Sequence, residues 1–216
     1  MQSLRRLALV CACLPLAGAL LPARAEDTPP DVLVKNVTLE VIDIVSKDKE
    51  IRDGNRRKVI DLIDAKVLPH FNFSGMTALA LGANWPKANA EQKTRLVEEF
   101  RTLLVRTYAS AIASYSDQKF DFRPLRAKPT DTDVLVQVRV MQSGAQPVSI
   151  DYSMEKTPGG WKVYDVMVGG VSLVANYRTE FANQVRDVGF DGLIKTLQTK
   201  NRTLERQASA AGTGKK

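Results

Sequence analysis

The sequence predicts an α+β domain in which helices wrap a small, curved antiparallel sheet of about four strands, with a helical lobe beside it. Two observations predict this class. Before residue 116 and after residue 170, apolar residues recur every three or four positions, which is the period of amphipathic helices. Between these parts, apolar and polar residues alternate in runs joined by short turns, which is typical of an antiparallel meander. We divide the chain into a cleaved signal peptide (1–25), a single α+β domain (26–206) and a disordered tail (207–216).

The N-terminus has the pattern of a secretory signal peptide. Arg5 and Arg6 precede an apolar segment, residues 7–21, and Ala23-Arg24-Ala25 is a cleavage site of the A-x-A type. The apolar segment is too short to span a bilayer, which argues against a retained membrane anchor. We therefore expect export to the periplasm and cleavage before Glu26.

Cysteine content and charge exclude several classes of function. Both cysteines, Cys11 and Cys13, lie in the signal segment, so the mature chain has no disulfide, no thiolate nucleophile and no cysteine metal site. Removing Arg5, Arg6 and Arg24 leaves 28 basic against 24 acidic residues, a net charge of +4. That mild excess suits anionic lipid surfaces or acidic partners and is too small to indicate nucleic acid.

Three helices are expected first, of which the third is short. Asp31 is placed to cap a helix that ends at Asp53-Gly54-Asn55, and its apolar face holds Val34, Val37, Val41, Ile44 and Val45. The second helix covers residues 56–67, and the third covers residues 73–81.

The next helix is the clearest element. Asn89 and Gln92 have the spacing of a capping box, so the helix begins at residue 90. Its broad apolar face consists of Leu96, Phe100, Leu103, Leu104, Thr107, Tyr108, Ala111, Ile112 and Tyr115.

Four strands are expected at residues 119–125, 133–141, 148–155 and 161–168. The last is apolar on both faces, so the face that points inward stays open. Gly169-Gly170 permits a sharp corner, after which two helices follow, the first with Gly189 as its C-cap.

No catalytic set is apparent. His70 is the only histidine, and neither a G-x-S-x-G motif nor a calcium-loop pattern of carboxylates is present, so we expect no metal and no cofactor. One enzymatic alternative stays open: Asp165 beside Tyr164 could serve an isomerase or dehydratase that uses a buried Asp. The other interpretation of Asp165 is structural.

Three segments together resemble one family. They are residues 68–85 (LPHFNFSGMTALALGANW), 91–115 (EQKTRLVEEFRTLLVRTYASAIASY) and 160–181 (GWKVYDVMVGGVSLVANYRTEF). The chain is similar over about residues 30–204 to the MlaC family, the periplasmic phospholipid-binding component of the maintenance-of-lipid-asymmetry system, also called the toluene-tolerance auxiliary family. One departure is Asn72, where relatives often carry an acidic residue.

The resemblance implies a nuclear-transport-factor-like body that holds the acyl chains of a phospholipid in a deep pocket. It also implies lipid exchange with an outer-membrane lipoprotein complex and with an inner-membrane ABC transporter that bears a lipid-binding ring domain. We expect a monomer with phospholipid as cargo. An isomerase-type or dehydratase-type enzyme on the same fold and a ligand-free periplasmic adaptor are the alternatives. The sequence leaves open the transport direction, the number of acyl chains, the head-group preference and the partner-contact surfaces.

On this interpretation two apolar walls enclose the acyl chains, in a cavity of about 1,000 Å³ or more. The predicted helical wall consists of Met76, Leu79, Phe100, Leu104, Tyr108 and Ile112. The predicted wall from the sheet and the stretch after it consists of Val138, Tyr152, Met154, Tyr164, Val166, Val171, Val174 and Tyr177. Arg139 and Arg178 are predicted to bind the head group at the rim, with solvated salt bridges as the alternative.

Overall fold

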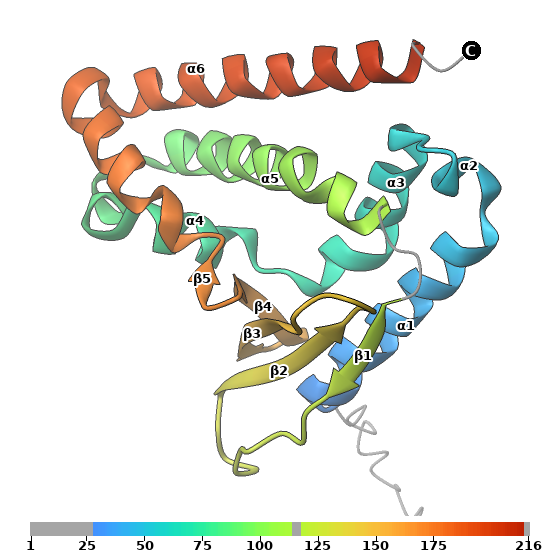
Figure 1. Cartoon of the computed structure of the whole chain (residues 1–216). Helices are drawn as coiled ribbons and strands as arrows, with labels where there is room; N and C mark the ends of the chain where they lie inside the picture. Colours follow the sequence, from blue (N-terminus) through green and yellow to red (C-terminus); the bar gives the residue numbers. More distant parts are fainter. Residues whose placement is uncertain (1–27, 114–117, 214–216) are drawn as a thin grey trace, which may run out of the picture.

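The chain folds as helices, then an antiparallel sheet, then a long helix, in the computed structural model, which describes residues 28–113 and 118–213 (Figure 1). The α-helices are α1 (Pro30–Lys47), α2 (Lys49–Arg52), α3 (Arg56–Leu62), α4 (Phe73–Leu81), α5 (Ala90–Ala113) and α6 (Arg178–Thr213). The strands are β1 (Lys119–Phe122), β2 (Asp133–Met141), β3 (Val148–Thr157), β4 (Gly160–Val168) and β5 (Val171–Ser172). The predicted signal peptide and Tyr115 lie outside the described residues.

The predicted α+β class is confirmed, with five strands in place of about four. The sheet is an antiparallel meander in the order β1-β2-β3-β4-β5, and the additional strand, β5, is only two residues long. Helices α4, α5 and α6 form a lobe above the sheet, and α1 crosses its lower right side in Figure 1. Helix α6 continues to Thr213, into the tail that was predicted to be disordered from residue 207. Among the described residues, no helix is long and apolar enough to cross a membrane.

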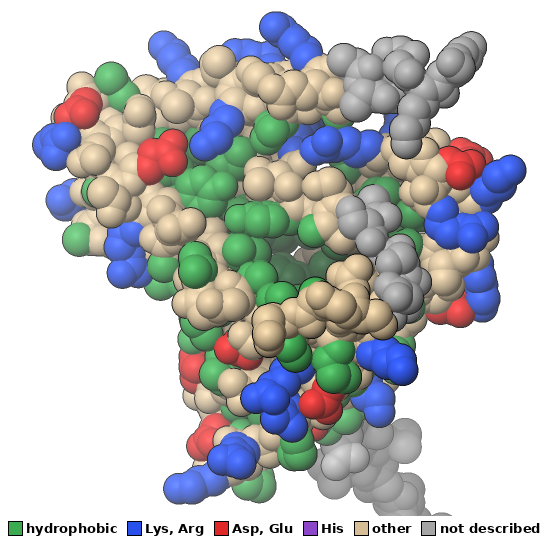
Figure 2. Space-filling view, viewed as in Figure 1, with side chains coloured by type: hydrophobic (Ala, Val, Ile, Leu, Met, Phe, Trp, Pro, Cys, Tyr) green, Lys and Arg blue, Asp and Glu red, His purple; other side chains and the backbone are tan. Residues whose placement is uncertain are grey.

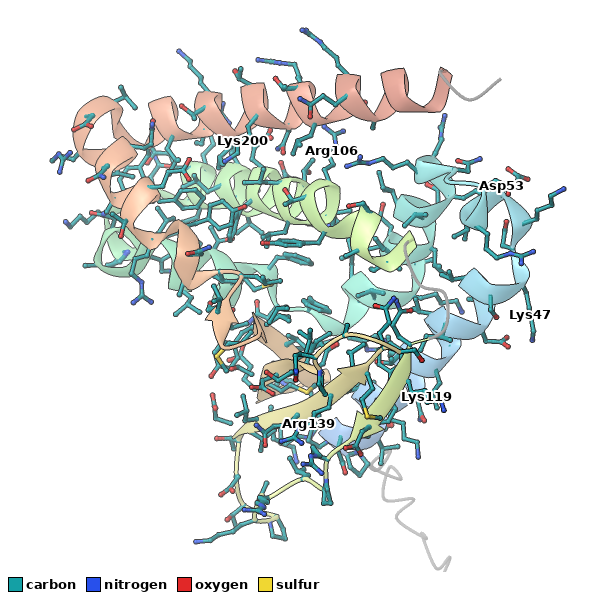
Figure 3. The ribbon with its side chains drawn as sticks, in the orientation of Figure 1. Lys47, Asp53, Arg106, Lys119, Arg139 and Lys200 are labelled. Atoms are coloured by element: carbon teal, nitrogen blue, oxygen red, sulfur yellow. The ribbon has the colours of Figure 1, made fainter. Side chains whose placement is uncertain are left out.

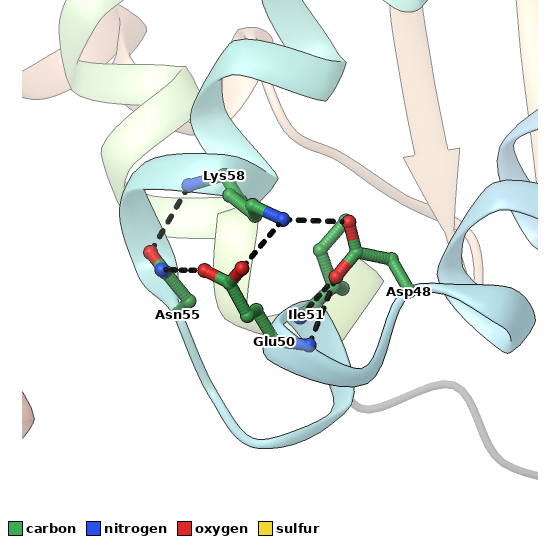
Figure 4. Close-up of polar contacts among 5 residues, drawn as sticks. All are labelled: Asp48, Glu50, Ile51, Asn55 and Lys58. Atoms are coloured by element: carbon green, nitrogen blue, oxygen red, sulfur yellow. Dashed lines mark hydrogen bonds and ion pairs between the residues drawn. The ribbon is translucent and has the colours of Figure 1, made fainter.

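The first helical segment ends earlier than predicted, at a corner that side chains stabilise (Figure 4). Asp48 Oδ1 accepts hydrogen bonds from the backbone N–H groups of Glu50 and Ile51, so Asp48 ends α1 and caps α2. Lys58 Nζ lies 3.0 Å from Asp48 Oδ2 and 3.0 Å from Glu50 Oε1, which ties α3 to this corner. The predicted cap at Asp31 is wrong, because Asp31 lies in the first turn of α1 behind Pro30 at the N1 position.

The predicted capping box is confirmed. Asn89 Oδ1 accepts from the Gln92 N–H at 2.8 Å, and Gln92 Oε1 accepts from the Asn89 N–H at 3.2 Å. Helix α4 has the predicted bounds, and Asn72 caps it by accepting from the Gly75 N–H at 2.9 Å. Asn72 Nδ2 also donates to a Glu155 carboxylate oxygen, which an acidic residue at this position could not do unless protonated.

The helical lobe is held together by polar contacts between its helices as well as by apolar packing. Arg106 of α5 donates from Nη1 to the backbone oxygen of Asn201 in α6 at 2.6 Å, and its Nη2 lies 3.3 Å from Glu205 Oε2 (Figure 3). Asn201 is itself buried and donates to the backbone oxygen of Glu99 at 3.0 Å. Gly189, with φ of 70°, marks a kink where the sequence predicts the end of one helix and the start of another.

A β-bulge settles which face of β4 points inward. Met154 pairs with Val163, whereas Ser153 pairs with Asp165, so Tyr164 is an extra residue on β4. Trp161 and Val163 therefore point inward before the bulge, and Val166 points inward after it. One apolar face of this strand therefore points inward before the bulge, and the other apolar face points inward after it.

The predicted glycine corner is confirmed, but the helix after it begins at Arg178 rather than directly after Gly170. Gly169 and Gly170 have φ values of 58° and 83°, which only glycine adopts without strain. Asp165 Oδ1 accepts from the Val166 N–H and from Ser172 Oγ, both at 2.8 Å. Ser172 Oγ in turn accepts from the backbone N–H of Ala175 at 2.8 Å. Asp165 therefore joins the bulge to the corner, in agreement with the structural interpretation of this residue.

Three separate hydrophobic clusters support the fold. The helical cluster joins α4, α5 and α6 around Phe100 and Phe181. The sheet cluster joins the inner face of β2–β4 to Val34 at the start of α1. The corner cluster joins Val45 at the end of α1 to Val59 of α3 and to Ala109 of α5. Helix α1 is thus anchored at its two ends in two different clusters.

We predict that Asp165→Ala lowers the free energy of unfolding by about 1–3 kcal/mol, because the buried Val166 N–H and the Ser172 hydroxyl lose their acceptor. Urea denaturation of the variant and the wild type measures the difference. Asp165→Asn keeps an acceptor oxygen at the same place and serves as the matched control, with a clearly smaller loss. Equal losses in the two variants would contradict this role for Asp165.

Candidate functional site: an apolar cavity between the sheet, α1 and α5

A cavity of about 450 Å³ lies between the inner face of the sheet, α1 and α5. Figure 2 shows it as a hollow edged by hydrophobic side chains between the helical lobe and the sheet. The volume is smaller than the predicted 1,000 Å³, because aromatic and methionine side chains from both walls project into the space: Phe71, Phe73, Met76, Tyr108, Phe120, Tyr152 and Met154.

Helix α1 forms one wall, because its two ends are buried in packed clusters and the apolar residues between them face the cavity. Val34 and Val45, near the two ends, are buried in the sheet and corner clusters. Val37 and Val41 between them are only half-buried and line the cavity, together with Thr38 and Ile42. The sequence predicted this helix but assigned it no part in the site. Its apolar face, together with Ile42, was the signal that could have identified the wall.

The cavity reaches the surface at one end of the sheet. Val168 lines the cavity and is 36% exposed, and it pairs with Ile150, which also lines it. Val148 and Val171 share the inner face at this end and are 42% and 54% exposed. Apolar side chains therefore continue from the interior of the cavity to its mouth.

Half of the predicted wall residues line this cavity. They come from α4, α5, β3 and β4, and they are Met76, Leu104, Tyr108, Ile112, Tyr152, Met154 and Val166. The structure therefore brings the two predicted walls face to face, although α1 and the segment before α4 complete the enclosure.

The other predicted wall residues lie elsewhere. Phe100 and Val174 are buried in the helical cluster, and the ring centroids of Phe100 and Tyr177 are 5.1 Å apart. Leu79 packs against the same cluster, and Val138 is buried in the sheet cluster.

Tyr164 and Val171 do not line the cavity, for two further reasons. The bulge turns Tyr164 to the outer face of the sheet, where its hydroxyl donates to Asp133 Oδ2 at 2.9 Å. Val171 lies on β5 and is largely exposed at the mouth.

Neither predicted rim arginine lines the cavity. Arg139 lies on the outer face of β2, where its register partners are Asp121 and Ser149 (Figure 3). Arg178 donates from Nε and Nη2 to the backbone oxygen of Leu79, both at 3.2 Å, and its side chain packs beside Gly82. Arg178 therefore joins the start of α6 to the end of α4.

The polar residues that line the cavity are Thr38, His70, Tyr108, Gln118 and Tyr152. Burial raises the pKa of Tyr152 to about 12 and also raises the pKa of Tyr108, so both phenols are neutral at physiological pH. Burial, together with the nearby charge of Lys162, lowers the pKa of His70 below its usual 6.5 despite the opposing charge of Glu40. Within residues 28–113 and 118–213, no group of three His, Cys, Asp or Glu side chains could hold a metal ion.

We predict that His70 makes the protein less stable as the pH falls below about 6.5. The unfolded chain takes up a proton at His70 near its usual pKa, whereas the folded chain resists protonation because its pKa is lowered. Urea unfolding between pH 7.5 and pH 5.5 should show a loss of unfolding free energy in the wild type that His70→Gln does not show. A parallel decline in both proteins would assign the pH dependence to other groups.

Comparison with known proteins gives consistent matches. The family model described as "MlaC protein" matches residues 35–199. The chain is 27% identical over 177 residues to the intermembrane phospholipid transport system binding protein MlaC of Haemophilus influenzae, covering 80% of this chain and 82% of that protein. It is 27% identical over 174 residues to the toluene tolerance protein ttg2D of Pseudomonas putida, covering 80% of each.

A solved structure agrees in both sequence and fold. It is the phospholipid-binding protein of Ralstonia solanacearum in complex with a phospholipid, to which this chain is similar with a TM-score of 0.77 and 36% sequence identity. The similarity covers 82% of this chain and 99% of that one. The family match, the curated relatives and this structure agree with one another, and the chain belongs to the MlaC family.

Proposed function

We propose that this protein is a periplasmic carrier that holds the acyl chains of a phospholipid in the cavity between the sheet, α1 and α5. The observation that carries the proposal is the cavity itself, whose lining is apolar apart from five polar side chains and continues to an apolar mouth. The phospholipid bound to the Ralstonia solanacearum relative supports the choice of cargo.

A carrier is needed because acyl chains are insoluble in water. Burying one methylene gains about 0.8 kcal/mol, so roughly thirty methylenes of a diacyl lipid cost on the order of 25 kcal/mol to expose. The cavity of about 450 Å³ encloses hydrocarbon and opens at an apolar mouth, so acyl chains can extend from the enclosed space toward the surface.

The proposal includes two exchange partners, as family membership suggests. Lipid would pass to or from an outer-membrane lipoprotein complex and an inner-membrane ABC transporter with a lipid-binding ring domain. The signal-peptide pattern of residues 1–25 supports a periplasmic location. The head group would remain at the mouth, in contact with water.

Solvent extraction of the purified protein followed by mass spectrometry tests the proposal directly. A carrier yields phospholipid in near-stoichiometric amount. A protein that stays empty after incubation with phospholipid vesicles would contradict the proposal and favour the adaptor alternative.

We predict that Val37→Trp and Val41→Trp each lower the ratio of bound lipid to protein severalfold, because an indole from α1 would occupy the cavity. Leu39→Trp is the matched control, since Leu39 lies on the same helix, is 45% exposed and faces away from the cavity. The control should have the same ratio of bound lipid to protein as the wild type. Unfolding free energies within about 1 kcal/mol of the wild type would show that lost loading does not reflect lost folding. Equal loading of all three variants would place the lipid elsewhere.

A further inference from the structure

Tyr152 places a hydroxyl group inside an otherwise apolar part of the cavity. Its position on β3 lies between Val136 of β2 and Val166 of β4, and all three residues belong to the inner face of the sheet. Within residues 28–113 and 118–213, no side chain or backbone group forms a hydrogen bond with this hydroxyl. In the same part of the chain, the side-chain atoms that are both fully buried and without a hydrogen-bond partner are Arg56 Nε, Asp151 Oδ1 and Asn201 Oδ1. The Tyr152 hydroxyl is not among them, so it is not fully buried.

The hydroxyl therefore keeps contact with free space, and that space is the cavity. Tyr152 lines the cavity, and burial by the surrounding protein raises its pKa to about 12. A phenol hydroxyl in apolar surroundings is destabilised when its bond to water is not replaced. An acceptor that enters the cavity with the cargo would remove this cost.

The depth of Tyr152 indicates which part of a lipid can supply the acceptor. Tyr152 lies two residues farther along β3 than Ile150, which pairs with Val168 at the mouth, a distance of roughly 7 Å along the strand. At that depth the cargo consists of its acyl chains and the groups directly attached to them. In a diacyl phospholipid, the polar groups attached directly to the chains are the two esters, and their carbonyl oxygens are good acceptors.

We propose that the Tyr152 hydroxyl donates a hydrogen bond to an ester carbonyl oxygen of the bound lipid, so that the cavity selects ester-linked over ether-linked chains. This inference rests on the proposed function and adds a polar contact that fixes how deep the cargo sits. Tyr108 is the other phenol of the cavity, on the opposite wall, and its hydroxyl is the competing donor.

The test is a competition between two lipids that differ only in the linkage. The purified protein is incubated with vesicles containing equal amounts of diacyl-phosphatidylcholine and dialkyl-phosphatidylcholine of the same chain length, and the bound lipids are measured by mass spectrometry. One neutral hydrogen bond corresponds to an ester-to-ether ratio of about three- to tenfold in the wild type. Tyr152→Phe should bring that ratio to near one while retaining lipid.

Two matched variants show whether the effect belongs to Tyr152. Tyr164→Phe removes a phenol hydroxyl from the neighbouring strand on the outer face, and Tyr108→Phe removes the other phenol of the cavity. Tyr164→Phe should keep the wild-type ratio. Because the ratio is independent of the total amount bound, a variant that loads less lipid still gives an answer.

Each remaining outcome contradicts the inference in a distinguishable way. A wild-type ratio near one would mean that water satisfies the hydroxyl, and an unchanged ratio in Tyr152→Phe would exclude Tyr152 as the donor. Loss of the preference in Tyr108→Phe alone would assign the contact to Tyr108. If the wild type binds neither lipid, the carrier proposal itself fails, and this inference fails with it.

Discussion

The structure depends on three hydrophobic clusters that pack tightly around a space that none of them fills. The helical, sheet and corner clusters each contain fully buried residues, such as Phe100, Met154 and Val59. The cavity lies where the three clusters meet, since its lining includes residues of all of them. Because α1 is anchored in two clusters and α5 in two, the walls cannot collapse onto one another without disturbing a packed core.

The same arrangement explains why much of the fold could be predicted from the sequence, whereas only half of the predicted wall residues line the cavity. The capping box, the glycine corner and the alternation of β2 depend on neighbouring residues, so local patterns predicted them. Phe100 and Tyr108 lie on the same apolar face of α5, yet the first is buried against Phe181 and the second lines the cavity. Periodicity predicts that a side chain points inward, but whether it meets another side chain or free space depends on tertiary packing.

Two local features could not be predicted from the sequence pattern, for a different reason. The bulge at Tyr164 exchanges the two faces of β4 in the middle of the strand, and a bulge has no signature in the alternation of a strand that is apolar on both faces. Arg178 is predicted from its charge to bind a head group at the rim, with a solvated salt bridge as the alternative. In the structure its guanidinium caps the backbone carbonyl of Leu79, a partner almost one hundred residues away.

A hollow interior has a thermodynamic consequence for a chain whose two cysteines, Cys11 and Cys13, both precede the described domain. Side chains that filled the cavity would add stability but would leave no room for cargo, so the empty protein forgoes part of the packing that a solid core provides. Cargo that binds the folded chain alone restores that packing and raises the free energy of unfolding in proportion to the logarithm of its concentration relative to the dissociation constant. Val37 and Val41 in the middle of α1 are half-buried and line the cavity, so they are among the side chains that regain contacts when cargo fills the space.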